Sequence, residues 1–301
     1  MTPTPVSGAI AVLCLLVAAQ FSDCAGHADE MDKPIGDAVF DLPLFDAHMH
    51  YKEPAWDLYP VQSVIELMDK NGVAMALVSS TPDEGTIRLW EYAPNRIVPE
   101  LRPYHGAAGS SNWTKMKGME SYLAGRLKAY PHEGIGEFHI HRLDTSDAPL
   151  FRKIIEMARG RDIYLHVHSG PEPVRWLFSL DPEVKIIWAH AGLSTPAERV
   201  YALMEEYPTL LADTSLREYD ILGDGGNLDP QWLEIAFDFQ DRLMIGSDTW
   251  INNQWDNYSR IITSNRRWLS RLPRQVAEKI AFKNAQRLFE RDISTEQFGS
   301  R

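Results

Sequence analysis

The stretch Leu42-Pro43-Leu44-Phe45-Asp46-Ala47-His48-Met49-His50 is the first of eight apolar, strand-like segments in this chain. Apolar runs of this length are typical of strands that are buried on both faces of a parallel sheet. The eight segments lie at Leu42–His50, Val73–Ser80, Arg96–Tyr104, Gly134–Ile140, Ile163–Ser169, Val184–His190, Leu210–Ser215 and Arg242–Asp248. Their regular succession predicts an α/β protein whose parallel strands are separated by other elements.

Helix-like segments lie between these strands, with apolar residues three and four positions apart. They include Val61–Lys70, Met116–Tyr130, Pro149–Arg159, Pro196–Tyr207 and Gln231–Phe239, and two extra helices follow the eighth strand at Tyr258–Leu269 and Pro273–Phe289. Eight β-then-α units in series predict a (β/α)8 TIM barrel in a single domain. An open doubly wound sheet is the alternative, but no Gly-x-Gly-x-x-Gly follows any strand.

The first 28 residues differ from the rest and are typical of a signal peptide. Residues 8–21 are apolar and uncharged, and small residues follow at Ala25, Gly26 and Ala28. The run is shorter than the roughly 20 residues that cross a bilayer, so we expect no stable membrane association once the leader is removed. Residues 1–7 contain no Lys or Arg, which leaves an uncleaved anchor as the alternative. We therefore expect export to the periplasm or the medium.

The remaining boundaries follow from this leader and from the strand pattern. A polar segment spans residues 29–41, the barrel spans 42–291 and a tail spans 292–301. Both cysteines, Cys14 and Cys24, lie in the leader, so the mature chain has no disulfide. A formal net charge of −12 without a basic stripe argues against nucleic acid as a partner. We expect a small-molecule substrate, and a homo-oligomer is compatible with the sequence.

Histidines and one acid occur where the predicted strands end. His48 and His50 are two residues apart on the first strand and therefore share a face. His168 ends the fifth strand, His190 the sixth and Asp248 the eighth. The carboxyl ends of barrel strands meet at one face, where the active sites of such barrels lie. Because imidazole and carboxylate are common ligands of divalent ions, the pattern predicts a metal site. Asp213 and Asp144 also follow strands, and for them we favour a structural role such as a helix N-cap.

Taken together, several short motifs in this order resemble the amidohydrolase superfamily, and its amidohydrolase-2 branch most closely. They are Phe45–His50, His168-Ser169-Gly170, Ile187–Gly192, Gly246-Ser247-Asp248 and Lys283–Phe289. The resemblance implies a metal-dependent hydrolase whose ligands are His48, His50, His168 and Asp248, with Asp248 also handling the proton of the bound water. His190 matches a histidine that binds a second metal in some members and polarises substrate or water in others.

The fourth strand leaves the number of metal ions open. Many dinuclear members carry a carboxylated lysine there, whereas this chain has Glu137 and no lysine on that strand. Glu137 would either bridge two ions or orient His50 or His168. The role of His139, two residues further on, stays open. We expect one or two divalent ions, with zinc as the first choice.

Such a site predicts hydrolysis of an amide, a lactone or another ester. The ion would activate water, Asp248 would accept its proton, and His190 would steady the charge on the carbonyl oxygen. Arg102, Tyr104 and Arg217 are candidates to bind a substrate carboxylate.

Two other functions compete with hydrolysis. The first is a metal-dependent decarboxylase of an aromatic or unsaturated acid, which the same branch of the superfamily also implies. The second is a non-catalytic exported protein that binds a metal or a small ligand.

Overall fold

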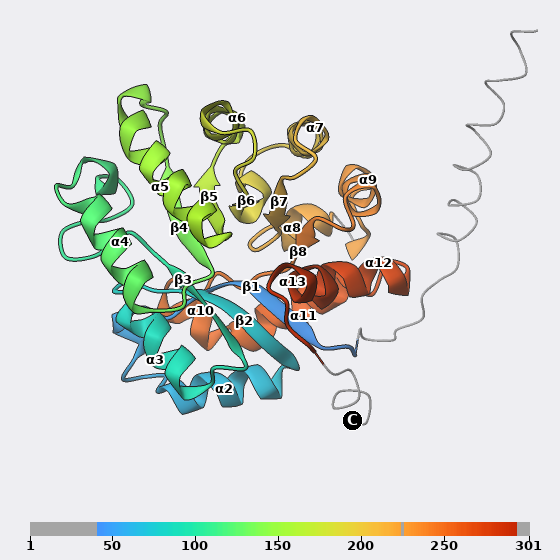
Figure 1. Ribbon diagram of the computed structural model, residues 1–301. Coiled ribbons are helices and arrows are strands. Elements are labelled where there is room, and N and C mark those ends of the chain that lie inside the picture. The colour runs from blue at the N-terminus through green and yellow to red at the C-terminus, as the bar shows by residue number, and fades with distance from the viewer. Residues whose placement is uncertain (1–40, 224–225, 294–301) are drawn as a thin grey trace, which may run out of the picture. The chain divides into compact units, whose positions relative to one another are not determined.

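Eight parallel strands follow one another around a barrel in the computed structural model, which describes residues 41–223 and 226–293 (Figure 1). The strands are β1 Leu44–His50, β2 Val73–Ser79, β3 Ile97–Leu101, β4 Gly134–Ile140, β5 Tyr164–Ser169, β6 Ile186–Trp188, β7 Leu211–Asp213 and β8 Leu243–Met244. Each strand pairs with the next in parallel register. The Ala47 N–H donates to Ile245 O at 2.9 Å and so joins the last strand to the first. The predicted (β/α)8 barrel is therefore confirmed.

Helices surround the strands and bury one face of each against them (Figure 1). In sequence order they are α2 Val61–Lys70, α3 Glu84–Tyr92, α4 Met119–Ala129, α5 Ala148–Arg161, α6 Pro171–Leu180, α7 Ala197–Glu206, α8 Glu218–Ile221 and α9 Pro230–Asp238. The 3-10 turns are η1 Glu53–Ala55, η2 Trp113–Lys115, η3 Thr145–Asp147 and η4 Ala189–Gly192. The apolar spacing explains this packing: α5, for example, buries Phe151, Ile154 and Ile155 on one side.

The chain after β8 is helical, as predicted, but it is more divided than the sequence pattern indicates. It contains α10 Asn252–Asp256, α11 Tyr258–Leu269, α12 Arg274–Glu278, the π-helical turn η6 Lys279–Lys283 and α13 Asn284–Leu288. The predicted helix Pro273–Phe289 is thus interrupted by η6, which buries Ile280, Ala281 and Phe282.

The eighth strand is shorter than the apolar run predicts because the chain turns toward β1 after Met244. The N–H groups of Ser247 and Asp248 both donate to His48 O, at 3.2 and 2.7 Å. Asp248 itself has a φ of +49°. This turn carries the Asp248 side chain to the carboxyl end of β1.

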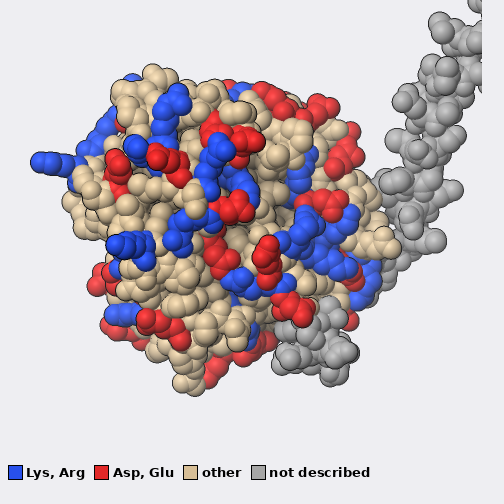
Figure 2. Space-filling view, viewed as in Figure 1, with Lys and Arg blue, Asp and Glu red and all other residues tan. Residues whose placement is uncertain are grey.

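The predicted leader, residues 1–28, lies outside the described residues. Within residues 41–223 and 226–293, no helix combines the length and the apolar character needed to cross a bilayer. On the face shown in Figure 2, positive and negative side chains are interspersed.

The junction of β1 and β8 leaves no room for a side chain at Gly246. A Cβ atom there would lie 2.6 Å from His48 Cβ and 3.0 Å from Ser215 Cβ. We predict that Gly246→Ala lowers the free energy of unfolding by about 1 to 3 kcal/mol, because overpacking must displace backbone. Gly125→Ala is the control: its Cβ would meet nothing within 4 Å on α4, and it should be neutral or stabilising. Urea unfolding measures both, and an unchanged midpoint for Gly246→Ala would contradict this packing.

Candidate metal centre

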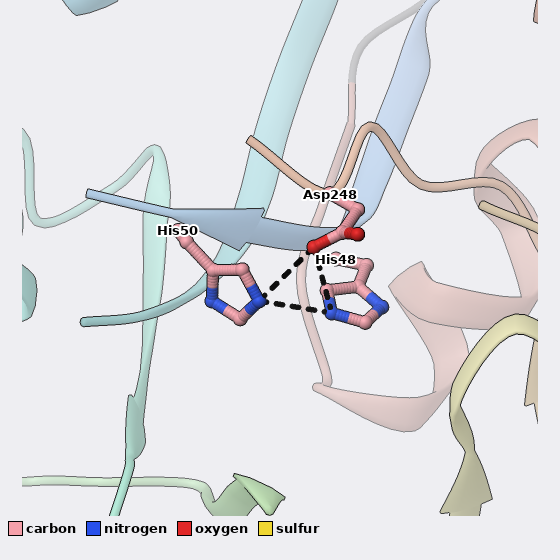
Figure 3. Close-up of side chains that lie close together, drawn as sticks. All are labelled: His48, His50 and Asp248. Atoms are coloured by element: carbon pink, nitrogen blue, oxygen red, sulfur yellow. Dashed lines mark hydrogen bonds and ion pairs between the residues drawn. The ribbon is translucent and has the colours of Figure 1, made fainter. Parts of the chain in front are cut away.

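Two histidines of β1 and the aspartate after β8 bring three ligand atoms together at the carboxyl end of the barrel (Figure 3). His48 Nε2 and His50 Nε2 lie 3.1 Å apart. Asp248 Oδ1 lies 3.2 Å from His50 Nε2 and 3.7 Å from His48 Nε2. All three residues are buried.

The outer ring nitrogen atoms of both histidines are held by acceptors. His50 Nδ1 lies 2.9 Å from Ser79 O, and His48 Nδ1 lies 3.2 Å from Asp213 Oδ2. A carbonyl or carboxylate oxygen accepts a hydrogen, so both contacts favour the tautomer with a hydrogen on Nδ1. In that tautomer each ring would direct a bare Nε2 toward the other, beside the Asp248 carboxylate.

This donor set fits a divalent cation. Zinc bonds of about 2.0 to 2.1 Å with tetrahedral angles would separate neighbouring ligand atoms by about 3.3 Å. The spacings of 3.1, 3.2 and 3.7 Å among His48, His50 and Asp248 are close to that value. The bare nitrogen atoms repel one another in the absence of a proton or a cation, and a bound metal ion would remove that repulsion.

Glu137, on β4, connects this group with a second one. Its Oε2 lies 3.3 Å from His50 Nε2, and its Oε1 lies 3.8 Å from His48 Nε2. The same Oε1 lies 2.5 Å from His168 Nδ1 and 3.5 Å from His190 Nε2. Glu137 thus lies between the His48–His50 pair and His168, a position that is compatible with both roles that the sequence left open.

His168 and His190 both lie beside Glu137, in two different sets of ligand atoms. His190 Nδ1 lies 3.1 Å from Ser215 O, and its Nε2 lies 3.5 Å from Glu137 Oε1. The ligand atoms of His168, Glu137 and His139 lie close together and form one set. Those of His48, Glu137 and His190 lie close together and form another. The ligand atom of His168 therefore does not lie in the set formed by His48, His50 and Asp248. The three sets overlap, because His48 and Glu137 each belong to two of them.

Buried charges set the electrostatics of the centre. Burial alone would raise the pKa of Glu137, but the Arg102 guanidinium and the hydrogen bond from His168 hold it well below its usual range. Burial also opposes ionisation of Asp248, yet the neighbouring imidazoles, His50 first and His48 next, lower its pKa. Two buried carboxylates with lowered pKa values give the centre the negative charge that attracts a cation.

Asp213 is a site residue that sequence reasoning missed. The structure gives it no helix-capping role: its Oδ2 lies 3.0 Å from His166 Nε2 and accepts from the backbone N–H of His190 at 3.2 Å, besides its contact with His48. His166 in turn lies 3.1 Å from Glu100 Oε2. Burial alone would lower the pKa of His166. The carboxylates of Glu100 and Asp213 have the larger effect and raise this pKa to about 10. The position of Asp213 at the end of β7 was the available signal.

Asp144, by contrast, caps η3, as expected.

A cavity of about 500 Å³ lies over the centre, and Glu137, His168 and Asp248 reach it. Of the predicted substrate-binding residues, Arg102 and Tyr104 line it. Arg102 donates to Glu137 Oε2 at 2.6 Å, and the Tyr104 hydroxyl lies 2.8 Å from His139 Nδ1. The position of Tyr104 therefore depends on His139.

Arg217 lies apart from this cavity. It donates to Ala191 O and Thr195 O at 3.3 and 2.8 Å and pairs with Asp220 at 2.7 Å. The structure therefore does not place Arg217 among the residues that surround the cavity, and its contacts hold the chain after β6.

A barrel with such a cluster at the carboxyl ends of its strands belongs to the class of metal-dependent hydrolases. The family model for amidohydrolases matches residues 132–291, which is more than half of the chain, so this protein belongs to the amidohydrolase family. This confirms the resemblance that the motifs indicated and makes the chain a hydrolytic enzyme. No curated protein matches the sequence.

Solved structures share the fold at low sequence identity. A lactonase from Listeria monocytogenes superposes with a TM-score of 0.60 at 10% identity, covering 84% of this chain and 96% of its own. A probable 2-pyrone-4,6-dicarboxylic acid hydrolase from Acinetobacter baumannii, with citric acid bound, gives 0.56 at 16%, covering 83% and 100%. A dihydroorotase from Campylobacter jejuni gives 0.53 at 14%, covering 84% of each chain.

Glu218, at the start of α8, provides a pH-dependent test of the packing beside the centre. Burial raises its pKa from 4.5 to about 7, although Asn265 Nδ2 donates to Glu218 Oε1 at 3.2 Å. The folded state therefore holds this proton more tightly than the unfolded state, and stability is lost as the pH rises from about 4.5 to 7.

We predict that Glu218→Gln, which stays neutral, removes this loss. At pH 8 the variant should be more stable than the parent by on the order of 2 to 3 kcal/mol, and the difference should shrink toward pH 5. Denaturant unfolding at both pH values measures it. If the variant and the parent differed in free energy of unfolding by the same amount at pH 5 and at pH 8, Glu218 would not titrate in this way.

Proposed function

We propose that this enzyme hydrolyses a lactone, an ester or an amide of a small molecule, with zinc as its cation. The observation that carries the proposal is the pair of nitrogen atoms, His48 Nε2 and His50 Nε2, which lie 3.1 Å apart beside Asp248 at the base of the cavity. When bound, a divalent cation supplies two things: it lowers the pKa of water to about 7 and polarises a carbonyl.

The protein's own groups would do the remaining work. Asp248 reaches both the ligand cluster and the cavity, so its carboxylate can accept a proton from the attacking water and return it to the leaving group. Glu137 holds His168 and His50 in place, and Arg102 fixes Glu137 from behind. His190 Nε2 faces Glu137 and shares a set of ligand atoms with Glu137 and His48, so we assign it to metal binding in preference to contact with the substrate carbonyl.

Lactones are the first substrates to test. A protein with this fold from Listeria monocytogenes is named a lactonase, and the Acinetobacter baumannii protein is named a hydrolase of a pyrone dicarboxylic acid. In the first assay, the zinc-loaded enzyme is incubated with a panel of lactones, aryl esters and amides, and the release of acid is measured. In the second, it is incubated with carboxylated aromatic compounds, and the release of carbon dioxide is measured. Turnover in the first panel supports the proposal. Carbon dioxide release without hydrolysis would replace it with decarboxylation.

Two substitutions separate metal binding from proton transfer. We predict that His48→Ala loses both bound metal and activity, because it removes a ligand from the buried group. Asp248→Asn should keep more of the metal but lower kcat by about 10²- to 10⁴-fold, because an amide cannot accept the proton. Elemental analysis measures the bound metal and rate measurements give kcat, both on the same samples.

Asp241→Asn is the matched control for Asp248→Asn. Asp241 precedes β8, whereas Asp248 follows it, and its exposed side chain pairs with Lys279 at the other end of the strand. This variant should retain parental activity and metal content. If Asp248→Asn matched it in rate, the proton-transfer role of Asp248 would be wrong.

A further inference from the structure

Lys52 lies two residues beyond His50, directly after β1, and its side chain lines the cavity together with Asp248 and His168. It is half-buried. Within residues 41–223 and 226–293, no hydrogen bond or ion pair engages its ammonium group, whose nearest described interaction is with the Trp250 ring at 5.6 Å from the centroid. The charge of Asp248 acts on Lys52 from across the cavity, but no described carboxylate contacts the ammonium group, which leaves it available to pair with an anionic group of the ligand.

The two arginines expected to bind a substrate anion are already engaged. Arg102 uses its guanidinium on the side chain and the carbonyl of Glu137, at 2.6 and 3.0 Å. Arg217 lies away from the cavity and pairs with Asp220. Among the described residues, Lys52 is therefore the Lys or Arg lining this cavity whose charged group is not already in a hydrogen bond or an ion pair.

Three exposed apolar side chains also line the cavity. Leu193, Leu216 and Trp250 line it, and they remain 37%, 37% and 45% exposed. Leu193 and Leu216 have φ values of +48° and +60°, a left-handed conformation that is unfavourable for a branched side chain. Strained backbone of this kind concentrates at functional sites, and here it presents two leucines beside the cavity.

We propose that Lys52 binds an anionic group of the substrate, a carboxylate or a phosphate, while Leu193, Leu216 and Trp250 contact its apolar body. This inference rests on the proposed function in taking the cavity as the substrate pocket. An ammonium group on a flexible stem pairs with either anion as a point charge, and the cavity volume suits a small molecule. The substrate class is thus an anionic lactone, ester or amide with an apolar or aromatic body.

Binding of non-reacting probes tests the anion site without requiring turnover. Benzoate, phenylphosphonate and neutral benzamide are titrated into the zinc-loaded enzyme and into Lys52→Met, Lys52→Arg and Lys70→Met, with ligand-observed NMR to millimolar concentration. Lys70, exposed at the end of α2, is the matched control. The metal content of every sample is measured, so that a loss of probe binding can be distinguished from a loss of the bound metal.

We expect Lys52→Met to weaken binding of an anionic probe at least tenfold and to leave benzamide unchanged, with Lys52→Arg and Lys70→Met close to the parent. The probe that loses affinity identifies carboxylate or phosphonate as the preferred group. Equal anion affinity in Lys52→Met and the parent, or no anion binding to the parent, would overturn the proposal.

Kinetics then link the anion site to the reaction. For a lactone carrying a carboxylate, Lys52→Met should raise KM with little change in kcat, whereas the matching carboxamide lactone should show no difference between the variants. An equal rise in KM for both lactones would overturn the proposal. Lysine-dependent anion binding without hydrolysis of any probe would instead retain the anion site and reject the hydrolytic function.

Discussion

The repulsion between two buried imidazole nitrogen atoms is the constraint around which the centre is built. His48 and His50 cannot turn their Nε2 atoms apart, because Asp213 and the Ser79 carbonyl fix the other side of each ring. The bare atoms lie 3.1 Å from each other, next to the carboxylate of Asp248. Without a cation or a shared proton, this arrangement brings two lone pairs and a carboxylate together in a buried position, which is unfavourable.

The barrel supplies the rigidity that keeps these atoms in place. Asp46 accepts hydrogen bonds from the backbone N–H of Ser247 at 2.9 Å and from the Tyr258 hydroxyl at 3.1 Å, so it ties β1 to the turn after β8 and to α11. The same turn donates to His48 O. The ligands from the first and the last strand are thus positioned by one junction, where Gly246 allows the backbones to approach closely.

The sequence predicted the fold well because apolar strands and amphipathic helices leave a local pattern, and the sites of His48, His50 and Asp248 follow from strand ends in a parallel barrel. Two features could not be read from that pattern. The first is the set of ligands to which His168 belongs, because that depends on the position of Glu137 on another strand. The second is the hydrogen bond from Arg102 to Glu137, because these two side chains are 35 residues apart in the sequence. Lys52 was missed because a lysine after a strand has the same local sequence pattern whether it faces solvent or a cavity.

X-ray diffraction from crystals grown with zinc, recorded on both sides of the zinc absorption edge, tests the central claim directly. The account predicts an anomalous peak within about 2.0 to 2.2 Å of His48 Nε2, His50 Nε2 and an Asp248 oxygen. A fully loaded crystal with its peaks elsewhere, and with the two imidazoles linked through a proton alone, would contradict it.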